Sequence, residues 1–121
     1  MERCPELIDL EVFFGSVAAA RYGNEGGWYY DHLTFRRVTP DECTTFTIEP
    51  AEDAVSVAYS RAGAEVVNVS LQHVVALDIE SSAGRQVLVG RVAAPKLEQL
   101  LKLQFSPDFA FSLVTSLPTY E

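Results

Sequence analysis

The sequence has few of the residues that build metal sites and covalent cross-links. It contains 2 cysteines and 2 histidines, and they do not form the close pairs that are typical of a zinc site. We therefore expect no metal and no cofactor. Because a reducing compartment keeps isolated thiols reduced, Cys4 and Cys43 are expected to be free.

Positive charge is also scarce. Lys and Arg number 9 against 17 Asp and Glu, which gives a formal net charge of -8. A chain of this charge is repelled by nucleic acid and by anionic bilayers, so neither is an expected partner. No run reaches the roughly 18 to 20 apolar residues of a membrane span. The start at Met1–Cys4 lacks the apolar segment of a signal peptide, so we expect a cytoplasmic protein.

Catalytic signatures are missing as well. The serines carry no GxSxG elbow, and no GxGxxG or GxxxxGK[ST] run is present. The glycines at positions 23, 26 and 27 do not follow a strand and open a helix, as a phosphate cradle requires. The sequence therefore favours a binding protein over an enzyme, without excluding an activity.

What the chain does contain is the composition of a folded protein. Of its 121 residues 48% are hydrophobic and 11% aromatic, and no linker divides them, so we expect one domain over residues 1–121. Leu7, Leu10 and Phe14 recur at helical spacing and predict an N-terminal helix within residues 5–22. The glycine-rich run after Tyr22 predicts a loop.

Most of the remaining chain alternates between apolar and polar residues, which is typical of strands. A change of phase at Gln72 and His73 predicts a bend or bulge. Pro95 opens an apparent helical face over residues 95–104. The predicted class is therefore α+β, with a mainly antiparallel sheet or partly open barrel of about six to seven strands and two helices. The predicted strands cover residues 28–38, 46–48, 55–59, 67–71, 75–79, 87–92 and 109–114.

Aromatic and acidic residues form the main candidate site. Trp and Tyr are common anchors of protein interfaces, and a negative field steers a basic partner. The ordinary structural explanation is that the rings cap the core and that the acids keep two turns solvated. The candidate partner-binding residues are Trp28, Tyr29, Tyr30, Asp31, Asp41, Glu42, Glu49, Glu52 and Asp53.

A second interpretation is a small-molecule or enzymatic pocket between the sheet and the predicted helix over residues 95–104. Its candidate lining is Asp31, His32, Tyr59 and His73. Asp31 and His32 are adjacent, so in a strand they would point to opposite faces and would not form a catalytic pair. A third interpretation is an accessory protein that pairs with a second copy through a strand edge.

Short segments resemble a known protein class. They are Phe13-Phe14-Gly15, Tyr30-Asp31-His32, the following Leu33-Thr34-Phe35-Arg36, and the alternating run from Val74 to Ile79. Over about the first two thirds of the chain this pattern resembles the small bacterial immunity proteins of polymorphic toxin systems, in particular the mostly β family called immunity protein 50. The chain departs from that family in the order of acids and histidine around Asp31. The resemblance implies a non-enzymatic inhibitor that binds a cognate toxin, and it transfers no catalytic residue.

Overall fold

The computed structural model describes residues 1–116, which fall into two compact units. One spans Glu6–Gln72 and is called here the five-stranded unit. The other joins Met1–Pro5 to the chain from His73 onward and is called the four-stranded unit. Whether the chain folds as a single domain stays a prediction. Among the described residues no helix has both the length and the apolar character needed to span a membrane.

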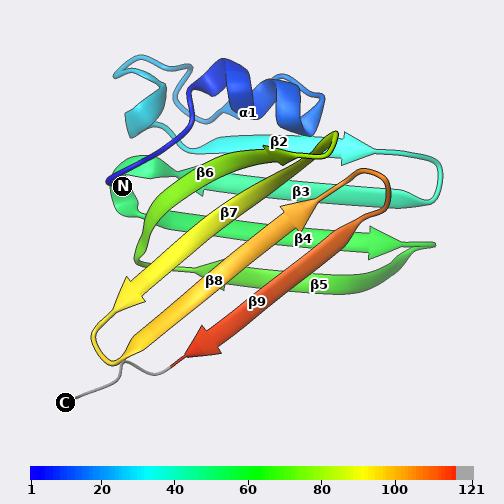
Figure 1. Cartoon of the computed structure of the whole chain (residues 1–121). Coiled ribbons are helices and arrows are strands. Elements are labelled where there is room, and N and C mark those ends of the chain that lie inside the picture. The colour runs from blue at the N-terminus through cyan, green and yellow to red at the C-terminus, as the bar shows by residue number, and fades with distance from the viewer. Residues whose placement is uncertain (117–121) are drawn as a thin grey trace. The chain divides into compact units, whose positions relative to one another are not determined.

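The five-stranded unit is an antiparallel sheet with one helix (Figure 1). Its strands follow one another in chain order, from β1 to β5. Each strand therefore pairs with the next along the chain, as short connections favour. The elements are α1 (Leu7–Phe14), β1 (Ala19–Ala20), the 3₁₀ turn η1 (Trp28–Tyr30), β2 (Leu33–Val38), β3 (Glu42–Glu49), the 3₁₀ turn η2 (Pro50–Glu52), β4 (Ala54–Arg61) and β5 (Ala64–Leu71).

The predicted N-terminal helix is confirmed, but it ends early. Gly15 takes the left-handed conformation with φ 67° directly after Phe14, and its N–H donates to the carbonyl of Val12. Only glycine adopts this conformation at little cost, so the helix stops there although apolar spacing continues to Val17. Val17 is accordingly 84% exposed.

Aromatic rings fix α1 to the sheet. Phe14 stacks on Phe35 of β2 and on Phe46 of β3, with ring centroids 5.0 and 4.7 Å apart. All three rings are buried, as are Leu33 and Ile48 beside them in the same register. The period-two alternation predicted from the sequence for β2, β3 and β4 therefore places one apolar face inward.

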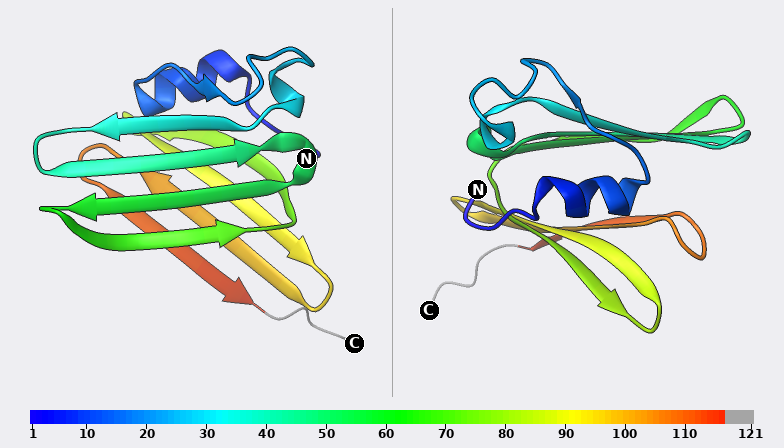
Figure 2. Two further views of the ribbon diagram at one scale, coloured as in Figure 1. Left: turned by 180° about the vertical axis from the view of Figure 1, so that it is seen from behind. Right: turned by 90° about the horizontal axis from the view of Figure 1, so that it is seen from above.

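The four-stranded unit is a second antiparallel sheet, in the order β6 to β9 (Figure 2). Residues near the N-terminus add to its first strand: the N–H of Glu2 donates to the carbonyl of Val75, and that of Leu77 to the carbonyl of Arg3. The Arg3 guanidinium pairs with Asp78 at 2.8 Å. The strands are β6 (Val74–Ser82), β7 (Arg85–Ala94), β8 (Leu97–Gln104) and β9 (Ala110–Ser116).

The helix predicted over residues 95–104 is wrong, because this segment forms β8. Pro95 and Lys96 make a tight turn, with Lys96 at φ 64°, and β8 then pairs with β7 along its length. Leu101 and Leu103 are buried, whereas Leu100 is 36% exposed. The Leu, Gln, Glu and Lys residues of this segment are good helix formers, so local propensity indicated a helix and pairing with β7 overrode it.

The strand count and the sheet arrangement also differ from the prediction. Residues 1–116 hold nine strands in two sheets rather than about six to seven strands in one sheet or a partly open barrel. The chain bends at Gln72, which is one of the two predicted alternatives, but His73 is not a bulge within a continuing strand. It takes φ 61° between β5 and β6, which belong to separate sheets. Trp28–Tyr30 form η1 rather than the start of a strand.

Candidate functional site

A row of hydroxyl groups crosses the polar face of the five-stranded sheet. The register pairs Thr34 with Thr47, Thr47 with Ser56, and Ser56 with Ser70. Side chains at paired positions share a face, so the four hydroxyls lie in one line across β2 to β5. Each residue is ordinary in the sequence, and only the register brings them together.

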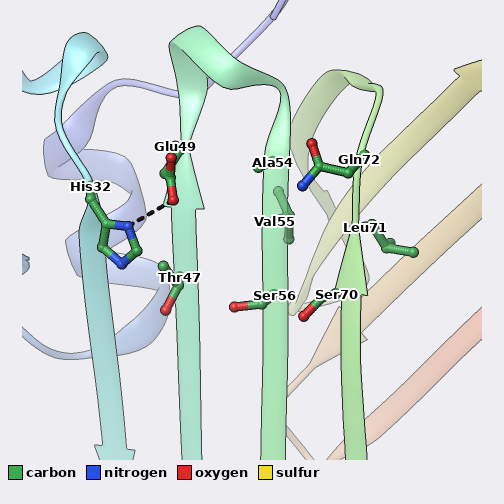
Figure 3. A pocket seen from close by; sticks show the side chains of 9 residues that line it. All are labelled: His32, Thr47, Glu49, Ala54, Val55, Ser56, Ser70, Leu71 and Gln72. Carbon is green, nitrogen blue, oxygen red and sulfur yellow. Dashed lines mark hydrogen bonds and ion pairs between the residues drawn. The ribbon is translucent and has the colours of Figure 1, made fainter.

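At the end of this row the side chains of His32 and Glu49 meet in a hydrogen bond. The Nδ1 atom of His32, just before β2, lies 2.8 Å from Oε1 of Glu49, the last residue of β3 (Figure 3). Because an ionised carboxylate can only accept hydrogen bonds, Nδ1 carries the proton in this contact. The side chains are 22% and 39% exposed, so the pair is partly shielded from water.

The pair and the hydroxyl row border a small pocket of about 170 Å³. Its polar side chains come from β3, β4 and β5, from the residue before β2 and from the residue after β5. Figure 3 shows them around a common space. The lining combines one carboxylate, one imidazole, three hydroxyls and one amide. The residues are His32, Thr47, Glu49, Ala54, Val55, Ser56, Ser70, Leu71 and Gln72.

Asp31, predicted as a surface contact, is 4% exposed and binds the backbone instead. Its carboxylate accepts the N–H groups of Tyr22, Asn24 and His32, at 3.0, 2.8 and 2.7 Å. Burial alone would raise the pKa of Asp31, but these three donors outweigh it and lower the pKa below its ordinary value. Asp31 therefore fixes the loop after Tyr22 and the backbone at His32.

The aromatic residues and one acidic turn come together. Trp28, Tyr29 and Tyr30 form η1, which lies beside η2, the turn that carries Glu52 (Figure 2). The ring centroids of Tyr29 and Tyr30 are 5.3 Å apart, and Tyr30 is 72% exposed. Glu49 precedes η2 and Asp53 follows it. One end of the sheet therefore presents aromatic rings next to carboxylates.

The other acidic turn lies apart from this end. Glu42 begins β3 and Glu49 ends it, so the carboxylates of Asp41 and Glu42 stand at the opposite end of the strand. Glu42 also pairs with Arg61 at 3.0 Å. Of the two predicted acidic turns, only the one around η2 adjoins the aromatic residues.

The four residues of the alternative pocket are not gathered around the pocket described above. Within the five-stranded unit, His32 lines it, whereas Asp31 is turned to the backbone and Tyr59 is 3% exposed with its hydroxyl bound to Arg61. His73 belongs to the four-stranded unit and is exposed. Within residues 1–116 no group of three or more His, Cys, Asp or Glu side chains is arranged to hold a metal ion.

A second hollow, of about 310 Å³, lies on the four-stranded sheet. Lys102 is the charged residue of its lining, and no acid or imidazole contributes to it. It offers less chemistry than the first pocket. Its lining is Val87, Lys102, Leu103, Gln104, Ala110, Phe111 and Ser112.

Comparison with known proteins finds a shared fold. No protein-family model and no curated protein matches the sequence. Among solved structures, the chain is similar to a chain of a contact-dependent growth inhibition toxin–immunity protein complex from Klebsiella pneumoniae 342. The likeness covers 95% of this chain and 97% of that chain, with a TM-score of 0.80 and 14% sequence identity. At the level of the fold it agrees with the resemblance to immunity proteins noted in the sequence.

Proposed function

We propose that the protein is an immunity-type inhibitor that binds and neutralises a basic protein toxin. The observation that carries this proposal is the fold shared over nearly the whole chain with a component of a toxin–immunity complex. The sequence resemblance to immunity proteins points independently in the same direction. Neither depends on the detail of any one site.

Charge supports the role of inhibitor over that of toxin within such a pair. A toxin that acts on nucleic acid must approach phosphates, and a net charge of -8 opposes this approach. The same charge attracts a basic partner and raises the rate of encounter. We therefore place this chain on the inhibitor side and its partner on the basic side.

The end of the five-stranded sheet at η1 and η2 is the proposed binding face. Exposed Tyr30 and half-buried Trp28 supply anchors, and Glu52 supplies charge that lies in water. Aromatic side chains contribute short-range burial to a complex, whereas exposed carboxylates act at longer range. The rival interpretation of a small-molecule protein is less favoured, because the pocket that gathers the polar groups, of about 170 Å³, is smaller than the usual ligand site. The larger hollow of about 310 Å³ has no acid or imidazole in its lining.

Binding kinetics against the protein encoded directly upstream of this chain's gene test the proposal. Glu52→Lys is expected to slow association at low salt and to flatten its salt dependence, because screening removes long-range attraction. Glu65→Lys makes the same charge change on β5, where Glu65 pairs with Ser60 at the far end of the sheet from η2. It is the matched control and should have the smaller effect.

Changes at the aromatic anchor residues should alter the dissociation rate rather than the association rate. Tyr30→Ala is expected to speed dissociation and leave association nearly unchanged. If the upstream protein forms no complex with the wild-type chain, the proposed function is wrong. If Glu52→Lys and Glu65→Lys slow association equally, the binding face is misplaced although the function stands.

A further inference from the structure

We propose that the pocket beside His32 receives the side chain of an arginine from the protein partner, with Glu49 as its paired carboxylate. This inference deepens the proposed function, and it rests on that function for the source of the arginine. The chemistry of the pocket itself stands on the described residues alone.

The size of the pocket selects the kind of guest. A volume of about 170 Å³ holds only a few water molecules, each of which occupies about 30 Å³ in the liquid. Drug-sized ligands and nucleotides use pockets of about 300 Å³ or more. The space therefore suits one side chain rather than a free cofactor or substrate.

The polar atoms of the pocket select the charge of the guest. The lining includes no Lys or Arg, and Glu49 supplies a carboxylate. Three hydroxyls, from Thr47, Ser56 and Ser70, add further acceptors. A guanidinium has five N–H donors in a fixed plane and no acceptor, so it matches a carboxylate flanked by hydroxyls better than an ammonium does.

The carboxylate is held in place before any guest arrives. Oε1 of Glu49 lies 2.8 Å from Nδ1 of His32. The backbone N–H of His32 is in turn fixed by Asp31, which also binds the amides of Tyr22 and Asn24. The buried Asp31 carboxylate thus fixes the backbone at His32, and the imidazole of His32 holds Glu49. Such preorganisation reduces the entropy lost when a guest binds.

A blocked arginine tests the chemistry of the pocket without any partner. We would titrate N-acetyl-arginine amide into the isotope-labelled protein and follow the NMR signals of His32, Ser56 and Ser70. We expect saturable shifts confined to the pocket, with a dissociation constant of about 1 to 10 mM for so small a ligand. The citrulline analogue has the same shape without the charge, and it should bind at least about tenfold more weakly.

Two variants and a matched control locate the effect. Glu49→Gln keeps the size of the side chain and removes its charge, so arginine should no longer bind. Glu65→Gln makes the same chemical change at an exposed acid outside both the lining and the proposed binding face, and arginine should bind as in the wild type. Ser56→Leu keeps every charge and fills the space, so it should also block arginine. Equal binding of arginine and citrulline, or wild-type binding by folded Glu49→Gln and Ser56→Leu proteins, would overturn the inference.

The upstream-encoded protein then separates the inference from the proposed function. Glu49→Gln should weaken the complex about tenfold, because the contact between His32 and Glu49 is partly shielded from water. Glu65→Gln, on β5 away from the proposed binding face, should change affinity less than about twofold. If the complex forms and Glu49→Gln binds as tightly as the wild type, the pocket inference fails and the proposed function stands. If no complex forms but free arginine binds in the pocket, the proposed function fails. The pocket then still binds arginine, but the claim that the partner supplies this arginine fails as well.

Discussion

Two neighbouring leucines of β8 provide a sharp test of the strand that replaced the predicted helix. Leu101 is 1% exposed and lies opposite Gly90 of β7, whereas Leu100 is 36% exposed on the other face. In a helix over residues 95–104 both side chains would share one face. In the strand only Leu101 belongs to the buried side.

The expected losses of stability follow from this difference. Leu→Ala removes three carbon atoms, each worth about 0.8 kcal/mol when buried, and the cavity left behind adds more. Leu101→Ala should therefore cost about 3 to 4 kcal/mol. Leu100→Ala leaves no closed cavity and should cost about 1 kcal/mol or less.

Urea unfolding at equilibrium measures both variants. The midpoint for Leu101→Ala should fall well below that of the wild type, and the midpoint for Leu100→Ala should stay close to it. The slope of the transition should be unchanged in both, so that the difference reports stability. Equal losses in the two variants would refute the strand assignment and restore the helical phase.

Three further predictions concern the loop, the surface and the thiols. Because the pKa of Asp31 is lowered in the folded state, its contribution to stability is present above the ordinary Asp pKa and is lost as the pH falls through the lowered value. Asp31→Asn should therefore be less stable at neutral pH and should lose less stability in acid than the wild type, as urea midpoints across this range would show. Tyr30→Ala should keep the wild-type melting temperature, because Tyr30 is 72% exposed, and a large drop in a thermal scan would make it a core residue. When the protein is unfolded without reductant, a thiol reagent should label both Cys4 and Cys43. An unlabelled protein whose mass is two hydrogens below that of the reduced chain would show a disulfide and contradict this.

The strands that the sequence predicted best are those whose alternation is purely local. In β2 and β3, Leu33, Phe35, Phe46 and Ile48 turn inward at every second position, and no distant residue is needed to see it. In β8 the decisive information lies outside the segment, because seven residues of β7, 88–94, pair with it. A segment of good helix formers gives no local sign of this.

The pocket could not be predicted for the same reason. His32 and Glu49 are 17 residues apart, and they meet only because β2 and β3 pair in one register. The hydroxyl row needs the register of four strands at once. The burial of Asp31 could not be predicted either. The loop that covers it donates the amides of Tyr22 and Asn24 to its carboxylate, and the sequence indicates this loop only by its glycines.

The most direct test of the central claim is growth of a bacterial host that expresses the protein encoded directly upstream of this chain's gene. The account predicts that this protein alone arrests growth and that co-expression of the wild-type chain restores it, while the Glu52→Lys, Tyr30→Ala double variant restores it poorly at equal abundance. Arrest that continues despite abundant, folded wild-type chain would contradict the account.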